Sequence, residues 1–331
     1  MTMTAPDAAS GIASILRMPG AEEYVCTLSE EVQRLAQEEL GEDPKRREED
    51  IEAVRTWLKR QPHLNARTDR TTILRYLRGC KFSLEETKAK MEMYYMCKGA
   101  MPDMFQGRDP QDPALRTILK MGLMFPLPGR DPQGRTVIFG RLGAWDPSKV
   151  KPEDLFRAAG MLFDVLFLED EQTTVTGIVQ ANDMTGLTFK HVAALPFPLV
   201  RKVLLTWQEG YPLRPKSVHY INTPQAFDTL FNLFKPLMKE KMKNRVHVHG
   251  NKLSGMHKFV PKSMLPNEYG GTGGTIQEIS EYWLQKMDHH RAWFLEDEKH
   301  RADETRRPRK PKTDAILFGS VEGSFKKLSI D

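Results

Sequence analysis

The residues with the clearest potential for chemistry are histidines near the end of a strand-like run. His247 and His249 alternate in RVHVHGN, and alternate residues of a strand project from the same face. Two imidazoles on one face are compatible with a metal site. A third ligand at a fixed spacing is missing, and the sequence does not place His219 beside the pair. We therefore interpret them as structural histidines and predict no metal site.

Other patterns associated with catalysis or cofactors are weak. Cys26, Cys80 and Cys97 are few and scattered, with no CxxC pair, so we interpret them as free thiols. The glycine-rich stretch 270–274, GGTGG, lacks the lysine of a phosphate-binding loop and predicts a turn. No GxSxG nucleophile motif occurs. We predict no catalytic residues, no cofactor and no enzymatic activity.

Cations beside an apolar segment are more informative. Arg201 and Lys202 interrupt the otherwise apolar run 195–207, LPFPLVRKVLLTW, and Arg214 and Lys216 follow it. A net charge of +5 is modest for 331 residues, and neither a concentrated basic face nor an aromatic platform for nucleic acid is evident. Local cationic clusters of this kind favour an anionic membrane surface.

The elements that must position these residues divide the chain into unequal parts. Residues before about 110 predict a small helical bundle, in which Ser83 and Glu86 have the spacing of a helix N-terminal capping box. Arg70, Arg78 and Lys81 would project from roughly one side of a helix, either as a solvated face or as part of the basic surface. The predicted domains are 1–110 (helical), 111–275 (alternating strands and helices) and 276–331 (a helix with a partly mobile tail).

After residue 110, strand and helix signals alternate. The predicted strands cover Arg135 to near Gly143, Gly177–Asp183, Ser217–Asn222 and Arg245–His249. Helical patterns separate them, including an apolar helix at 153–169 and an amphipathic stripe from Phe227 to Met238. Alternation at this spacing predicts an α/β fold with a largely parallel sheet.

An excess of apolar side chains suggests that the second part is hollow. The helix at 153–169 and the segment at 195–207 are apolar on more faces than one sheet could cover. Ordinary core packing is the alternative for any single residue. The hypothesis of a ligand cavity predicts that its lining includes some of Phe163, Phe167, Ile178, Leu187, Val200 and Leu204.

Several motifs together resemble a known family. They are LRYLRGCKF followed by SLEETK, GRTVIFGRLGAWDP, YPLRPKSVHYINTP, FKPLMKEKMKNRVHVHGN and LPNEYGG. In content and order they resemble the CRAL-TRIO lipid-binding family, including its tocopherol- and retinaldehyde-binding members, over roughly residues 30–285. The resemblance implies a helical domain before a sheet whose covering helices enclose one hydrophobic ligand.

The resemblance also implies functional positions. A mobile gate helix falls on residues 196–207, and the basic cleft that binds phosphoinositide head groups falls on Arg201, Lys202, Arg214 and Lys216. Two departures from the tocopherol-binding pattern stand out. Cys80 replaces an arginine of the cleft, with Lys81 next to it, and Asn182 replaces a phenylalanine of the pocket.

These observations predict an intracellular carrier that binds and transfers a small hydrophobic lipid of tocopherol, retinoid or similar type, and docks reversibly on anionic membranes. The longest apolar stretch, 161–168, is too short to cross a bilayer, and the first twenty residues do not resemble a secretory signal. We predict a cytoplasmic protein with peripheral membrane contact. The alternative is a phospholipid-sensing adaptor with the same pocket and a protein partner, but no transfer activity.

Overall fold

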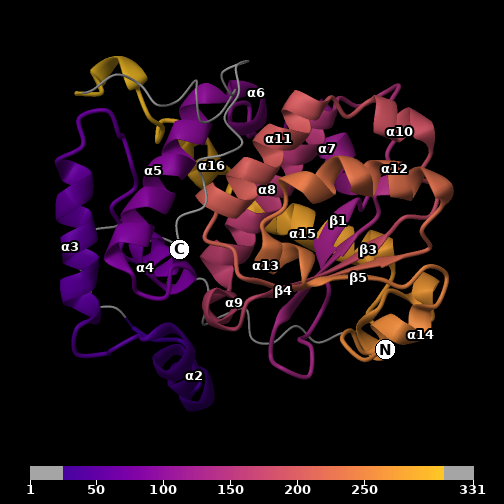
Figure 1. The fold of residues 1–331 in the computed structure, drawn as a ribbon, viewed down its shortest axis with the longest axis horizontal. Helices are drawn as coiled ribbons and strands as arrows, with labels where there is room; N and C mark the ends of the chain where they lie inside the picture. Colours follow the sequence, from indigo (N-terminus) through magenta and orange to yellow (C-terminus); the bar gives the residue numbers. More distant parts are fainter. Residues whose placement is uncertain (1–24, 309–331) are drawn as a thin grey trace.

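The computed structural model describes residues 25–308. The apolar residues near the C-terminus, expected to dock back onto the body, lie outside this range, as do residues 309–314 of the charged segment 301–314 that we expect to be mobile. The first part of that segment is described and contacts the helical part, because the N–H groups of Ala302 and Asp303 donate to the carbonyls of Tyr95 and His63 at 2.9 and 2.8 Å. Helices and strands alternate through the second half of the described chain, and helices alone occupy its first part (Figure 1).

The N-terminal part is helical, as predicted. Three of its helices begin at a side chain that caps them: Ser29, Asp69 and Ser83 each accept a hydrogen bond from a backbone N–H in the first turn of the following helix. Buried side chains such as Ile51 and Val54 pack these helices against one another. The helices are α2 (Glu30–Leu40), α3 (Arg47–Lys59), α4 (Arg70–Gly79), α5 (Leu84–Ala100) and α6 (Pro102–Phe105).

A five-stranded sheet forms the centre of the second part. The strands lie in the order β1 (Met124–Pro126), β2 (Thr136–Gly140), β3 (Ile178–Asp183), β4 (Pro215–Ile221) and β5 (Val246–Val248). The pairings from β2 to β5 are parallel, while β1 pairs antiparallel with β2. The four predicted strands and the largely parallel sheet are confirmed. The prediction missed β1, which has only three residues.

Helices cover both faces of this sheet. In Figure 1, α8, α11 and α12 lie on one side, which we call the pocket face, and α14 lies on the other, the back face. The remaining helices are α7 (Pro113–Lys120), α8 (Pro152–Glu169), α9 (Glu171–Thr176), α10 (Phe189–Ala193), α11 (Phe197–Leu205), α12 (Gln225–Phe234), α13 (Glu240–Lys243), α14 (Leu253–Met256), α15 (Ile276–His289) and α16 (Arg291–Asp297). Short 3-10 turns are η2 (Leu142–Ala144), η4 (Lys235–Leu237), η5 (Lys262–Met264), η6 (Asn267–Tyr269) and η7 (Glu304–Arg306), and a π-helical turn is η3 (Thr206–Gly210).

The long helix α8 follows from its sequence. Pro152 occupies the first turn together with Glu153 and Asp154, a combination that suits a helix N-terminus because proline needs no hydrogen-bond acceptor there and carboxylates interact favourably with the helix dipole. Most of its C-terminal half is buried. The predicted helix at 153–169 is therefore confirmed.

Two predicted helices end earlier than expected. The stripe from Phe227 to Met238 is interrupted because Pro236 follows the end of α12, and the chain continues as the 3-10 turn η4. The C-terminal helical pattern is divided at His290 into α15 and α16.

Buried ion pairs connect the helical part to the sheet part. Arg78 is 1% exposed and donates to Glu42 and to Glu171 at 2.8 Å each. It is therefore a structural cation, which corrects the prediction that it projects from a basic surface. In the same way, Lys98 of α5 pairs with Asp297 of α16 at 2.5 Å. Breaking a buried pair by removing one partner is strongly destabilising.

Candidate functional site

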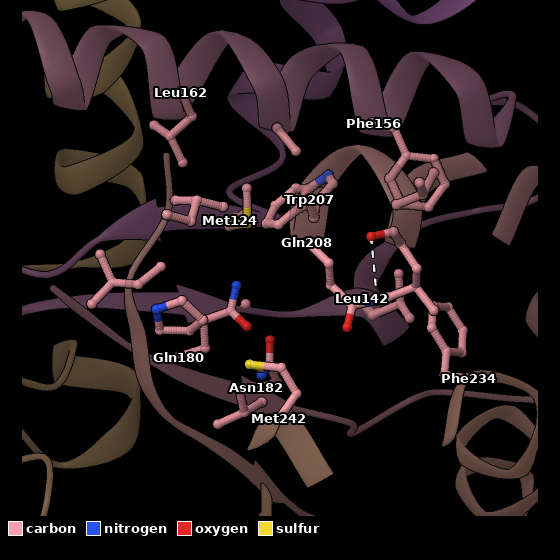
Figure 2. Close-up of a pocket in the computed structure, with 18 of the residues that line it drawn as sticks. Met124, Leu142, Phe156, Leu162, Gln180, Asn182, Trp207, Gln208, Phe234 and Met242 are labelled. Carbon is pink, nitrogen blue, oxygen red and sulfur yellow. Dashed lines mark hydrogen bonds between the residues drawn. The ribbon is translucent and has the colours of Figure 1, made fainter. Parts of the chain in front are cut away.

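A cavity of about 620 Å³ lies between the pocket face of the sheet and the covering helices. Figure 2 shows side chains from α8 above the cavity and side chains from the strands below it. Most of the lining is apolar and comes from segments far apart in the sequence. It includes Met124, Leu142, Phe156, Leu162, Trp207, Phe227, Phe231, Met242 and Trp283.

The floor consists of alternate residues from two central strands. Ile178, Gln180 and Asn182 of β3 line the cavity, as do Val218 and Tyr220 of β4. Because successive strand residues point to opposite faces, this is one continuous face of the sheet. Two of its five side chains are amides, so the floor is not purely apolar.

The helix α11 and the turn η3 contribute part of the cover. Leu204 and Trp207 line the cavity from this segment. The next residue, Gln208, connects it to the following helices, because its side chain donates to the carbonyl of Leu237 at 3.0 Å and accepts from the N–H of Lys239 at 2.9 Å. Displacing this segment would open the cavity and break these two hydrogen bonds.

One side of the cavity is bordered by cations, which we call the basic rim: Lys81, Arg214, Lys216, Lys241 and Arg245. Burial lowers the pKa of Lys241, and the charges of the other four rim cations lower it further. All five cations line the same cavity although they come from four separate segments of the chain. The rim therefore presents a concentrated positive potential at the cavity.

A carboxylate from the helical part contacts this rim. Glu39 of α2 accepts a hydrogen bond from Lys216 Nζ at 2.9 Å and one from Arg214 Nη2 at 3.3 Å. The hydrogen bond from Lys216 lowers the pKa of Glu39, with a further contribution from Arg214. Glu39 therefore remains ionised at neutral pH and partly neutralises the rim.

The loop between α4 and α5 positions Lys81. Lys81 and Phe82 have φ angles of 54° and 57°, a left-handed conformation that is costly for residues with a β-carbon. This turn places Lys81 at the rim while the preceding Cys80 is buried. Burial raises the pKa of the Cys80 thiol, which is therefore protonated at neutral pH.

The structure separates the predicted pocket residues into two groups. Ile178, Asn182 and Leu204 line the cavity. Phe163, Phe167, Leu187 and Val200 do not line it and instead lie buried in the side-chain clusters around it. Phe163, for example, contacts the ring of Trp207 at 4.7 Å between centroids, so Trp207 borders the cavity in its place.

The predicted basic residues also fall into two groups, one at the cavity and one away from it. Lys81, Arg214 and Lys216 belong to the rim, whereas Arg201 and Lys202 of α11 do not border the cavity. The sequence prediction missed Lys241 and Arg245. Lys241 and Arg245 are four residues apart, just before β5. This spacing predicts two cations at the rim only when the path of the short helix α13 is known.

The histidines gather on the back face. The rings of His219 and His247 stack at 4.9 Å, and His219 Nδ1 lies 3.0 Å from His249 Nε2. The described range 25–308 contains no group of three or more His, Cys, Asp or Glu side chains arranged to hold a metal ion. Within the same range, no helix is long and apolar enough to cross a membrane.

Comparisons with known proteins agree with this architecture. Residues 120–271 match the CRAL/TRIO domain family, and residues 43–115 match the family described as Pinta-like, UBA domain. A mouse protein described as alpha-tocopherol transfer protein-like is 34% identical over 84% of this chain and 81% of its own length. Clavesin-1 of Xenopus laevis is 31% identical over 71% of this chain and 70% of its own length.

A solved structure, that of Sfh5, superposes with a TM-score of 0.43 and 11% identity, covering 79% of this chain and 98% of that one. The family assignment rests on the sequence relatives. The chain belongs to the CRAL-TRIO family, whose members bind and transfer lipophilic ligands. The resemblance inferred from the motifs is confirmed.

Proposed function

We propose that this protein carries one lipophilic molecule in the cavity and exchanges it at membranes with anionic head groups. The observation that carries the proposal is a largely apolar cavity of about 620 Å³ whose rim is cationic. Cavities of roughly 300 to 1,000 Å³ with few polar groups are typical of small-ligand sites. One of the two relatives named above, the mouse protein, is described as alpha-tocopherol transfer protein-like.

The cavity would supply retention of the ligand. Burying about 400 Å² of apolar ligand surface contributes roughly 10 kcal/mol before the cost of immobilisation. Ile178 and Leu204 are proposed ligand contacts, with Asn182 as a polar one. No bond of the ligand is made or broken in this process.

The basic rim would supply reversible docking. Each lysine or arginine near an anionic leaflet contributes only about 1 kcal/mol, so a few cations bind without trapping the protein. Phosphoinositide head groups, with several phosphates, match a cluster of this size. Arg201 and Lys202 would add to the contact from α11, where Phe197 is 48% exposed.

The helix α11 would act as the gate. It supplies Val203 and Leu204 to the lining, and η3 supplies Trp207. Contact with the membrane would favour an outward position of this segment and lower the barrier to ligand exchange.

A vesicle assay tests the proposal. Donor vesicles carry retinol, tocopherol, cholesterol or phosphatidylcholine, each labelled, and acceptor vesicles contain or lack a phosphoinositide. We expect the protein to accelerate transfer of at least one lipid, and more so toward the anionic acceptors. Binding without acceleration would contradict transfer and favour the phospholipid-sensing adaptor, and release of a chemically altered lipid would contradict a non-enzymatic carrier.

A pair of variants tests the basic rim. Lys81 and Lys241 are exposed and form no ion pair with another residue in the range 25–308. We expect Lys81→Gln/Lys241→Gln to weaken binding to phosphoinositide vesicles roughly 10-fold or more, at about 1 kcal/mol per charge, without changing ligand retention. The control Lys252→Gln/Lys258→Gln removes the same charge from exposed positions that do not border the cavity. Equal weakening by both would argue against a rim-specific interaction.

A further inference from the structure

The floor of the cavity carries two amide side chains at its centre. Gln180 and Asn182 stand two residues apart on β3 and therefore project from the same face. Both line the cavity, and Figure 2 shows their side chains directed into it. Because β3 is the middle strand of the sheet, the amides have a neighbouring strand on each side.

The protein does not satisfy the hydrogen-bonding capacity of these amides. The Gln180 side chain has no hydrogen-bond partner within residues 25–308. The Asn182 amide nitrogen donates only one long bond, of 3.4 Å, to the carbonyl of His219. An amide offers two donors and two lone pairs, so most of this capacity faces the cavity.

A third polar group lies at the same level. Tyr220 pairs with Asn182 in the register between β3 and β4 and also lines the cavity. Its hydroxyl has no hydrogen-bond partner in the described part of the chain. Burial raises its pKa to about 12, so it remains a neutral donor at physiological pH.

The neighbouring strand leaves room for the Asn182 amide. Gly140 of β2 pairs with Asn182, and a β-carbon at Gly140 would lie 2.6 Å from Asn182 Oδ1. A side chain at this position would displace the amide oxygen. The glycine therefore permits the amide orientation seen in the structure.

This arrangement restricts the chemistry of the ligand. A hydrocarbon that filled the cavity would remove water from the amides without replacing its hydrogen bonds, which is unfavourable. We infer, resting on the proposed function of lipid carriage, that the ligand is a neutral lipid with a hydroxyl or carbonyl group that hydrogen-bonds to Gln180 and Asn182. These two residues then select it over a hydrocarbon of the same shape.

Competition within matched pairs tests this inference. The full-length protein is incubated with an equimolar mixture of phytol, phytane, cholesterol and cholestane, repurified, and its bound lipids are measured by mass spectrometry. We expect an alcohol-to-hydrocarbon ratio of about 10 or more, the order expected when one buried polar group is left unpaired. The variant Gln180→Met/Asn182→Leu keeps similar volumes and should bring the ratio close to one.

Two further variants separate hydrogen bonding from shape. Gln180→Asn/Asn182→Gln retains both amides and should keep most of the selectivity. Gly140→Ala should reduce it by displacing Asn182 without changing the amide chemistry. Equal retention of alcohol and hydrocarbon by the unmodified protein, or an unchanged ratio in the Met/Leu variant, overturns the inference while leaving lipid carriage intact. Retention of none of the four lipids argues against carriage itself.

Discussion

The two faces of the sheet have opposite surroundings although the same strands form them. On the pocket face, Ile178 and Val218 border a cavity. On the back face, the alternate residues of the same strands, such as Val179 and Ile221, pack into a closed cluster with residues of the segment 256–265. The back face consists of Val137, Phe139, Val179, Ala181, His219 and Ile221.

The difference shows that residue type on the strands does not decide which face is hollow. Val179 and Val218 are both buried valines, yet only Val218 borders the cavity. What differs is the cover. The segment containing Met256 and Val260 contacts the back face directly, whereas α8, α11 and α12 are spaced so that their side chains surround an open volume.

Truncating one phenylalanine on each side gives the largest expected contrast. Phe139 is fully buried on the back face between Phe125 and Tyr269, so Phe139→Ala should lower the free energy of unfolding by about 3 to 5 kcal/mol. Phe156→Ala should cost clearly less because Phe156 already borders the cavity, and it should weaken ligand retention instead. Denaturant unfolding of the ligand-free variants measures the loss of unfolding free energy. Equal losses in Phe139→Ala and Phe156→Ala would contradict the difference between a closed back face and a hollow pocket face.

Acid should destabilise the back face specifically. Burial, together with the neighbours His247 and His249 and more weakly Arg135, lowers the pKa of His219 to about 3. The folded state then binds fewer protons than the unfolded state below pH 6.5, so the free energy of unfolding falls as pH decreases from about 6.5 toward 3. One such group contributes a slope of up to about 1.4 kcal/mol per pH unit.

The measurement is denaturant unfolding across that pH range. We expect His219→Gln to flatten the slope, because glutamine does not titrate. The exposed His289 provides a matched control, and His289→Gln should leave the slope unchanged. A slope that survives His219→Gln would assign the acid sensitivity to other groups.

Adding volume should affect the two faces in opposite ways. Val179→Phe would overpack the closed cluster and lower the free energy of unfolding by about 1 to 3 kcal/mol. Val218→Phe can place its ring in the cavity, so stability should change little while lipid retention falls. Unfolding curves and bound-lipid quantification on both variants check this, and the contrast fails if Val218→Phe also destabilises the protein by that amount without reducing retention.

Much of the sheet architecture could be predicted from the sequence. Strand periodicity and turn residues located β2 to β5. The pocket residues Ile178, predicted from the excess of apolar side chains, and Asn182, predicted from the family resemblance, both line the cavity, and strand alternation puts them on one face. The same alternation implies Gln180, which the prediction overlooked. Because alternate residues of a strand share a face, Gln180 must lie on the same face as Ile178 and Asn182.

Helical lining residues were harder to predict. The helix α8 is apolar on most sides, so its sequence does not distinguish Leu162, which borders the cavity, from the adjacent Phe163, which does not. The rim presents a similar difficulty, because Lys241 and Arg245 approach Lys81 only through tertiary folding. Neither arrangement has a local spacing that reveals it.

The smallest expected effect concerns access to the hollow face. The Glu39 carboxylate contacts Arg214 and Lys216 and is 44% exposed. An anionic head group that binds these cations must compete with it, and an exposed ion pair of this kind contributes only about 0.2 to 1 kcal/mol. Glu39→Gln should therefore raise the affinity for phosphoinositide vesicles roughly two- to five-fold.

The neighbouring residue supplies the control for this effect. Glu38 is exposed on the same helix and forms no ion pair within residues 25–308, so Glu38→Gln makes the same change in net charge without freeing the rim. Vesicle co-sedimentation at low and high salt measures both variants, since screening should diminish the difference. If the two variants gain equally, long-range charge rather than competition at the rim accounts for the effect, and Glu39 has no special role in access to the cavity.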